Sequence, residues 1–234
     1  MPYYYYAYDW TYFLVLIGAV LSIIASVRVN TTFNKYAKVR SMTGMTGAEA
    51  AQRILQYNGI YDVQIRQVSG NLTDHYDPRN KTLNLSDSVY GSASVAAVGV
   101  AAHECGHAIQ HKEGYGPLKL RSALVPAANI GSRLGIPIIL LGIIFSYNYV
   151  LIQVGIWVFA LAVLFQVVTL PVEFNASSRA VQALDQMGIL AGQEVGQCRK
   201  VLSAAAMTYV AAAAAAILQL LRLILLFGGN RRRD

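Results

Sequence analysis

The stretch from Leu134 to Leu170 limits the possible folds of this 234-residue chain more than any other, because none of its 37 residues is charged. As one straight helix it would be about 55 Å long, whereas the hydrocarbon core of a bilayer is about 30 Å thick. A polar and aromatic cluster, Ser146-Tyr147-Asn148-Tyr149, lies near the middle, where a turn would fall. The stretch therefore predicts two antiparallel membrane spans, over roughly 134–147 and 151–170.

The composition is that of a membrane protein. Only 13% of the residues are charged and 55% are apolar, with a mean hydropathy of +0.41. Soluble domains contain about 25% charged and 45–50% apolar residues, so this composition excludes a soluble protein. The net charge of +7 does not indicate a nucleic-acid-binding protein, because the basic residues are scattered at the ends of apolar segments. Two cysteines are too few for a disulfide framework in a chain of this length.

Two further apolar segments lie near the ends of the chain. Thr11 to Val27 comprises 17 uncharged residues, and the Tyr-rich lead-in over residues 3–10 is typical of a membrane interface. No Lys or Arg precedes this segment, so it is expected to be an anchor rather than a signal peptide. Val201 to Phe227 is the last apolar segment. Arg222 inside it would cost about 2.5–3.5 kcal/mol at mid-bilayer, which leaves open whether the segment crosses fully.

Basic residues set the expected orientation. Residues 28–133 carry twelve Lys and Arg, whereas the first ten residues carry none, so this region is expected in the cytoplasm and the N-terminus outside. With four complete spans, Arg231-Arg232-Arg233 would end outside, against the same rule. Five parts are expected: an aromatic belt with the first membrane helix (1–27), a cytoplasmic region (28–133), a transmembrane hairpin (134–170), a second cytoplasmic helix region (171–200), and an apolar helix with a basic tail (201–234).

The region 28–133 has the pattern of a small α+β unit. Thr46-Gly47-Ala48-Glu49 fits a capping box, which predicts a helix from there to Asn58-Gly59. Residues 62–68 alternate like a strand, 83–85 form a second short strand, and Asp77-Pro78-Arg79-Asn80 supplies turn residues between them. A helix rich in Ala and Val is then expected from about 94 to 111, ended by Gly114 and Pro117.

That last helix contains the motif H-E-x-x-H, as His103-Glu104-Cys105-Gly106-His107. Four residues correspond to about 400° of helix rotation, so His103 and His107 project from one face, one turn apart. This is the spacing that two imidazoles need to share a tetrahedral zinc ion. Glu104 could then accept a proton from water that the metal acidifies. The alternative is a chance match, in which the two histidines are a hydrogen-bonded surface pair.

A catalytic zinc also needs a third protein ligand. His111 is two turns from His103 and too far to share the same tetrahedron, so it is interpreted as a polar helix end. The remaining candidates are Glu173, Asp185 and Glu194. Glu173 is favoured because the predicted hairpin returns the chain to the side of the membrane on which His107 lies. Its alternative role is an acid in the first turn of a helix that follows Pro171.

Three runs of sequence together resemble one family. The runs Leu72 to Pro78 (LTDHYDP), Ala101 to His111 (AAHECGHAIQH) and Leu170 to Ala180 (LPVEFNASSRA) look like those of the bacterial predicted membrane neutral zinc metallopeptidases. The resemblance spans nearly the whole chain and implies a zinc peptidase. The family is similar in plan to the membrane heat-shock and CaaX-processing metalloproteases, which pair H-E-x-x-H with a later E-x-x-A-D. Here Ser177 stands where that group has aspartate, so Asn175 or Asp185 could instead support the zinc histidines.

Other polar residues have weaker assignments. His75 could polarise a substrate carbonyl, although a loop histidine with a structural hydrogen bond is favoured. Tyr209 and Arg179 are conceivable oxyanion stabilisers, with no sequence spacing that distinguishes them from packing and surface residues. Cys105 inside the motif is interpreted as a small helix-packing residue.

These observations predict a mainly α, multi-pass membrane protein with a small α+β zincin-like cytoplasmic domain. The expected function is that of a zinc-dependent endopeptidase of the bacterial cell membrane, active on peptides or membrane proteins at the cytoplasmic face. One zinc ion would be held by His103, His107 and Glu173, with Glu104 as the general base. The alternative is a non-proteolytic zinc-containing membrane adaptor or chaperone, whose structural zinc would need four protein ligands.

Overall fold

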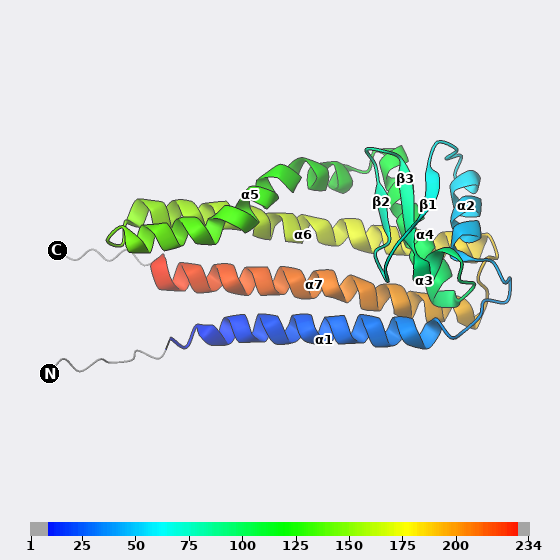
Figure 1. Ribbon diagram of the computed structural model, residues 1–234, viewed down its shortest axis with the longest axis horizontal. Helices are drawn as coiled ribbons and strands as arrows, with labels where there is room; N and C mark the ends of the chain where they lie inside the picture. Colours follow the sequence, from blue (N-terminus) through cyan, green and yellow to red (C-terminus); the bar gives the residue numbers. More distant parts are fainter. Residues whose placement is uncertain (1–8, 229–234) are drawn as a thin grey trace. The chain divides into compact units, whose positions relative to one another are not determined.

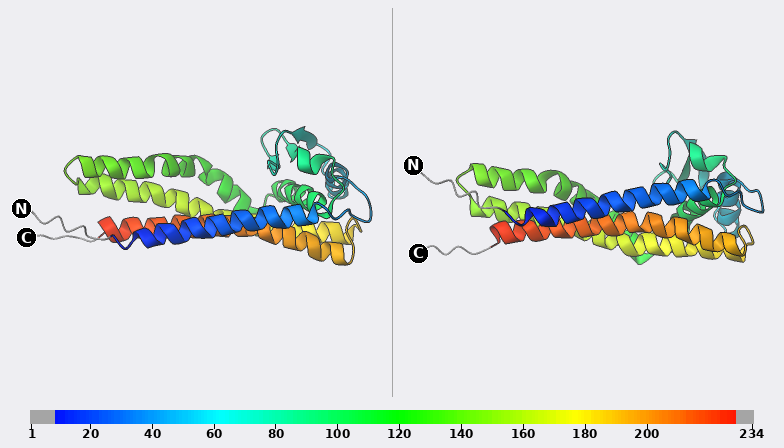
Figure 2. Two further views of the ribbon diagram at one scale, coloured as in Figure 1. Left: turned by 60° about the horizontal axis from the view of Figure 1, so that its bottom comes forward. Right: turned by 90° about the horizontal axis from the view of Figure 1, so that it is seen from below.

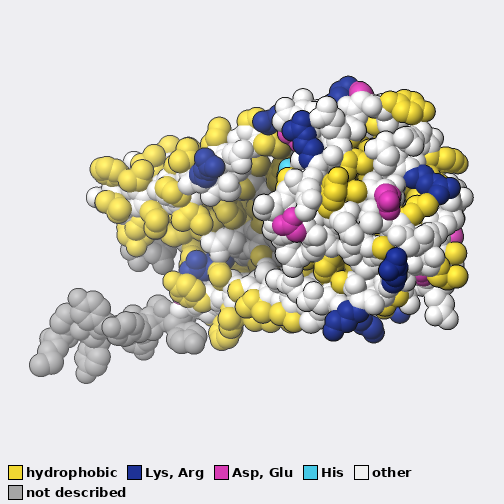
Figure 3. Space-filling model, turned by 45° about the vertical axis from the view of Figure 1, so that its right-hand side comes forward, with side chains coloured by type: hydrophobic (Ala, Val, Ile, Leu, Met, Phe, Trp, Pro, Cys, Tyr) yellow, Lys and Arg dark blue, Asp and Glu magenta, His cyan; other side chains and the backbone are white. Residues whose placement is uncertain are grey.

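The computed structural model describes residues 9–228, so the tyrosines expected at the membrane interface before Asp9 and the basic tail at 231–233 lie outside the described residues. The chain divides into two compact units. The first comprises residues 9–24, 124–167 and 210–228, and the second comprises residues 25–123 and 168–209. On the face shown in Figure 3, charged side chains gather over the second unit, whereas mostly hydrophobic side chains cover the helices of the first.

Four helices within residues 9–228 are long and apolar enough to cross a membrane. They are α1 (Tyr12–Tyr36), α5 (Gly116–Ile144), α6 (Tyr149–Gln186) and α7 (Gln193–Phe227) (Figure 1). Each exceeds the roughly 20 residues needed to span the hydrocarbon core. All four continue beyond the apolar segments of the sequence, because polar residues such as Lys and Gln extend a helix as readily as apolar ones. The last apolar segment is thus part of a 35-residue helix.

The uncharged stretch folds as a hairpin within the first unit. A tight turn separates α5 from α6 at Ser146 and Tyr147, both with left-handed backbone (φ +57° and +56°), where the sequence predicted it. The two helices lie side by side in both views of Figure 2. They approach closely at Gly135, where a Cβ atom would lie 2.8 Å from the Cβ of Phe159. Small residues permit this packing between helices in lipid.

The charge inside the last apolar segment is paired. Arg222 Nη2 lies 2.9 Å from Asp9 Oδ2, and the guanidinium lies 4.1 Å from the centroid of the Tyr12 ring. An intramembrane arginine is tolerated where it meets an acid and an aromatic face. This ion pair joins the two ends of the described chain within the first unit.

A small three-stranded sheet belongs to the second unit. It consists of β1 (Gln64–Val68), β2 (His75–Asp77) and β3 (Thr82–Ser86), in the order β1-β3-β2 (Figure 1). The predicted turn residues at 77–80 do form a turn before β3, but the extra strand β2, which precedes that turn, was not predicted from the sequence. Because β2 intervenes, β1 pairs with β3 in parallel, and β2 pairs with β3 antiparallel. The central strand β3 is buried at every position.

Three helices of the second unit surround this sheet. The first, α2 (Gly47–Tyr57), begins with the predicted capping box, in which the Thr46 and Glu49 side chains reciprocally bind backbone N–H groups. A single turn, α3 (Asp87–Tyr90), follows β3. The third, α4 (Val95–Glu113), starts at the N-cap Ser94 and ends at Gly114, whose φ of +67° suits glycine. Most of α4 is buried, so it forms the centre of the unit.

Gly106 sets how closely α4 and α6 approach in the second unit. A Cβ atom at this position would lie 2.6 Å from the carbonyl oxygen of Ala176 and 3.0 Å from its Cα. These are backbone atoms, so the neighbouring helix would have to move. Residues 172, 173, 176 and 180 of α6 are buried at helical spacing, which is the stripe that faces this contact.

We expect Gly106→Ala to lower the free energy of unfolding by about 1–3 kcal/mol, the usual effect of overpacking. The matched control is Gly196→Ala in α7, where no atom lies within 4 Å of the added Cβ. Removal of that glycine's backbone freedom should stabilise the protein by about 0.5–1 kcal/mol. Unfolding of both variants in detergent measures the difference. Equal stability of the two variants would contradict this account of the contact between α4 and α6.

Candidate metal centre

Helix α4 presents two histidines from consecutive turns. Their ring centroids lie 4.8 Å apart, and the ring planes are nearly perpendicular, at 83°. The side chain of His107 is 11% exposed and that of His103 is 14% exposed. The two imidazoles therefore face one small region that is largely shielded from solvent.

Glu173 of α6 lies against both rings. Its Oε2 atom is 3.2 Å from His103 Nε2 and 3.6 Å from His107 Nε2, and its side chain is only 2% exposed. The alternative role of Glu173, in the first turn of a helix after Pro171, is wrong. Helix α6 begins at Tyr149 and continues through Pro171, so Glu173 is remote from any positive helix terminus.

The donor atoms fit a tetrahedral zinc ion. Two ligand atoms that each lie about 2.1 Å from one tetrahedral metal are about 3.4 Å apart. The two Nε2–Oε2 distances bracket this value, and one ligand atom from each of the three residues lies within 4.8 Å of the others. Two imidazole nitrogens and a carboxylate oxygen are also the ligand set of many catalytic zinc sites.

The electrostatic field at His107 favours positive charge. Burial alone lowers the pKa of His107, but its close contact with the Glu173 carboxylate and the negative charge of Glu104 outweigh burial. The net effect is a raised pKa. An arrangement that favours a proton between two acids also favours a divalent cation there.

The second oxygen of Glu173 has a basic partner from α5. Arg121 Nη1 lies 3.7 Å from Glu173 Oε1, the oxygen that does not contact the histidines. This contact leaves Oε2 directed at the two Nε2 atoms. Arg121 was not recognised from the sequence, because a lone arginine near the start of a helix has no distinctive pattern.

Each histidine has a hydrogen-bond partner on its outer nitrogen. Ser177 Oγ lies 3.1 Å from His103 Nδ1, and Gln110 Oε1 lies 3.0 Å from His107 Nδ1. Ser177, whose position is occupied by aspartate in the E-x-x-A-D pattern considered above, thus contacts His103 itself. Asn175 and Asp185, which we considered as substitutes, do not bind either ring directly: Asn175 contacts Gln110, and Asp185 lines a separate groove.

Glu104 shares a cavity with the candidate ligands. The cavity has a volume of about 210 Å³, and its lining includes His103, Glu173, Ser177 and Tyr209. Glu104 is 8% exposed, so it is shielded but still lines this space. Of the two conceivable oxyanion stabilisers, Tyr209 lies in the cavity. Arg179 instead forms an ion pair of 2.7 Å with Glu113 at the end of α4.

The remaining acidic and thiol candidates have structural contacts. The Glu194 carboxylate accepts hydrogen bonds from the backbone N–H groups of Met42, at 2.7 Å, and Ala191, at 3.3 Å. It therefore tethers a loop near the start of α7. Cys105 is fully buried, its S–H group donates to Ala51, and burial raises its thiol pKa well above the usual range.

The other two histidines of the chain are held by polar contacts near β2. His75 Nδ1 lies 2.9 Å from the Thr73 carbonyl oxygen, and its Nε2 lies 3.1 Å from Asn84 Nδ2. His111 Nδ1 lies 2.9 Å from the Tyr76 hydroxyl. Burial and the charges of Asp62 and Asp77 raise the pKa of Tyr76 to about 12, which keeps this hydroxyl protonated.

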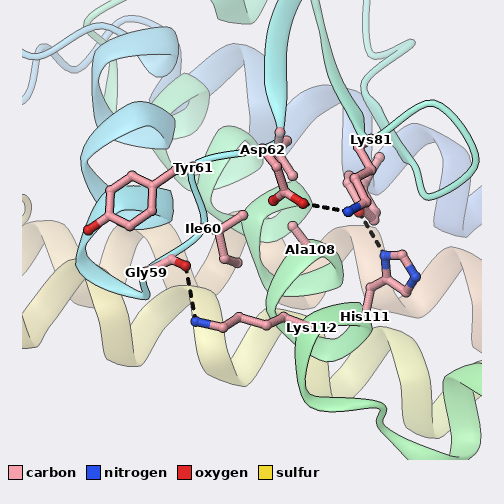
Figure 4. A pocket seen from close by; sticks show the side chains of 10 residues that line it. Gly59, Ile60, Tyr61, Asp62, Lys81, Ala108, His111 and Lys112 are labelled. Atoms are coloured by element: carbon pink, nitrogen blue, oxygen red, sulfur yellow. Dashed lines mark hydrogen bonds and ion pairs between the residues drawn. The ribbon is translucent and has the colours of Figure 1, made fainter.

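His111 lines a separate, larger cavity of about 670 Å³ at the end of α4. Figure 4 shows its polar rim, where Lys81 pairs with Asp62 and Lys112 binds the carbonyl oxygen of Gly59. Each cation at this rim is therefore already matched by an acid or a carbonyl.

A metal centre of two helix-borne histidines and a distant glutamate, in a chain with four helices of membrane length, is the arrangement of a membrane metallohydrolase. The chain belongs to the neutral zinc metallopeptidase family. The family model described as "Putative neutral zinc metallopeptidase" matches residues 11–228, which confirms the resemblance found in the sequence.

A relative from Bacillus subtilis (strain 168) is named "Putative membrane protease YugP". It is 48% identical over 199 residues, which cover 85% of this chain and 88% of that protein. No solved structure matches the chain with significance. The family and the apolar helices together associate this chain with zinc and with a membrane.

Proposed function

We propose that this chain is a membrane-anchored zinc-dependent endopeptidase, in which His103, His107 and Glu173 hold the metal and Glu104 is the general base. The observation that carries this proposal is the convergence of both Nε2 atoms on one oxygen of Glu173, beside a cavity that Glu104 also lines. The family and the relative named as a membrane protease support the same reaction class. The second unit would then be a zincin-like domain, with α4 as its active-site helix.

The residues of the cavity can each perform a different step of peptide hydrolysis. A zinc ion held by the three ligands would supply a Lewis acid for the scissile carbonyl and would acidify a water molecule. The Glu104 carboxylate takes the proton of the attacking water and then donates it to the nitrogen of the leaving amine. Tyr209 lines the same cavity, and its hydroxyl is the group that would donate a hydrogen bond to the carbonyl oxygen as it becomes negative.

The alternative function, a non-proteolytic adaptor or chaperone with structural zinc, has less support. Closed structural sites use four protein ligands, usually rich in cysteine. In the part of the chain that the structure describes, the potential metal cluster has three members and no cysteine. A fourth position is therefore left for water or substrate, as catalysis needs.

We further propose that the metal centre faces the cytoplasm of a bacterial cell. Twelve Lys and Arg follow the first apolar segment between residues 28 and 133, as expected for a cytoplasmic region. Helices α5 and α6 form a hairpin, so a chain that leaves the cytoplasmic face after Arg133 returns to it before Glu173. The turn at 145–148 would then lie outside.

Glu104→Gln tests the catalytic assignment. We expect the variant to keep its zinc while hydrolysis of a quenched fluorescent peptide library falls by about 10²–10⁴-fold, because the general base is lost. The parent should lose activity with a chelator and regain it when zinc is restored. Metal analysis of the same detergent-purified samples provides the control. Undiminished hydrolysis by the variant would exclude Glu104 as the base.

Glu173→Ala tests the third ligand. We expect zinc content to fall from about one ion per chain to well below that, since two histidines alone bind zinc weakly. Asp185→Ala is the matched control, because Asp185 belongs to the same helix but lies outside the cluster. Full zinc occupancy in Glu173→Ala would make Glu173 a mere hydrogen-bond partner of the histidines.

Two asparagine positions test the orientation. In intact cells, a membrane-impermeant thiol reagent should label Asn148→Cys, in the turn between α5 and α6, and should miss Asn80→Cys, in the turn between β2 and β3. Cys105 and Cys198 are buried and give little background. Both variants should react after the membrane is permeabilised. Labelling of Asn80→Cys alone from outside would reverse the proposed topology.

A further inference from the structure

Gln110 is a fully buried amide in the polar contacts behind the metal centre. It lies on α4, three residues after His107, and is 0% exposed. Buried polar groups are retained where their hydrogen bonds are made. Gln110 makes three: one to His107 Nδ1 at 3.0 Å, one to the carbonyl oxygen of Val172 at 2.9 Å, and one to Asn175 Oδ1 at 2.9 Å.

The direction of these bonds follows from the chemistry of the partners. A backbone carbonyl oxygen only accepts, so the Gln110 NH₂ group must face Val172 and its amide oxygen must face His107. An amide oxygen also only accepts, so the proton of a neutral His107 imidazole is on Nδ1. His107 Nε2 then carries a free lone pair, directed at the same side as Glu173 Oε2.

The second acceptor of the Gln110 NH₂ group is Asn175 Oδ1, which is itself oriented by another side chain. Arg179 Nε donates to Asn175 Oδ1 over 2.7 Å, and a guanidinium has donors only. The oxygen of Asn175, rather than its NH₂ group, is therefore held between Arg179 and Gln110. Arg179 also forms an ion pair with Glu113 at 2.7 Å and lies 5.9 Å from the centroid of the Tyr115 ring, contacts that are separate from its bond to Asn175.

The outer partner of the other histidine does not constrain it in this way. Ser177 contacts His103 through a hydroxyl, which can either donate or accept. Ser177 is compatible with either neutral form of His103. Of these two outer contacts, only that of Gln110 therefore determines which nitrogen of a neutral imidazole carries the proton.

We propose that Gln110 is a positioning residue that fixes His107 as the tautomer with a proton on Nδ1, and so presents Nε2 to the metal. Val172 and the Arg179–Asn175 pair hold the Gln110 amide in the required direction. This inference rests on the proposed zinc site, but it makes a separate statement about zinc affinity. Partners of this kind typically contribute 10–100-fold to metal affinity.

The test is the zinc dissociation constant of the full chain in detergent, measured by competition with a chromogenic chelator. Gln110→Met keeps the volume but removes all three hydrogen bonds, and we expect it to weaken zinc binding by about 10–100-fold. The matched control is Gln197→Met in the same unit. The side-chain oxygen of Gln197 is buried without a hydrogen-bond partner among residues 9–228, so its removal should leave zinc affinity unchanged.

A second set of variants tests whether Arg179 orients Asn175 and thereby Gln110. Arg179 is partly exposed, so its substitution is less disruptive to folding. Arg179→Met should weaken zinc binding toward the lower end of that range, about 10-fold, because Val172 still holds Gln110. Adding Asn175→Asp should restore the affinity, since both carboxylate oxygens accept and neither can point a donor at Gln110. Glu113→Gln, which breaks the ion pair but leaves the bond from Arg179 to Asn175, should bind zinc as the parent does.

Two results would overturn the inference while the peptidase proposal stands: zinc affinity unchanged in Gln110→Met, or a loss in Arg179→Met that Asn175→Asp does not repair. The second result would indicate lost packing. Zinc binding by the parent at this site, together with peptide hydrolysis that depends on Glu104, tests the proposed function separately. A parent chain that binds no zinc would overturn both.

Discussion

The second unit depends on the close approach of α4 and α6. All three candidate metal ligands come from these two helices. Their donor atoms lie close together because Gly106, which has no side chain, lets the two helix backbones come into van der Waals contact. A bulkier residue would move Glu173 away from both Nε2 atoms. The interior of α4 is rich in small apolar residues, which permits the same dense packing on its other sides.

This packing also explains why a carboxylate can be buried beside two imidazoles. Glu173 is 2% exposed, and an unpaired charge there would be strongly destabilising. Its two oxygens are instead divided between the histidines on one side and Arg121 on the other. The outer nitrogens of the histidines have partners of their own. Each of the three candidate metal ligands therefore has a polar partner besides the other two.

Local patterns in the sequence predicted the features that depend on nearby residues. The capping box at Thr46 and Glu49, the turn near Ser146 and the helical spacing of His103 and His107 all follow from short-range rules. Strand β2 was missed because three residues are too few to show alternation. Gln110 was not assigned a role, because Val172 and Asn175, which orient its amide, lie more than 60 residues away. Ser177 was not assigned one, because the similar sequence pattern has aspartate at that position. The only sequence signal for Gln110 was a polar amide three residues after a ligand.

The ion pair between Asp9 and Arg222 has a consequence for the order in which the chain is assembled. Proteins are made from the N-terminus, so Asp9 is synthesised before Arg222, which follows 213 residues later. An unpaired arginine raises the free energy of inserting a helix into lipid, by about 2.5–3.5 kcal/mol when it lies at the helix centre. The acid that pairs with Arg222 therefore comes from the segment just before the first helix, and it is available before the last helix is complete.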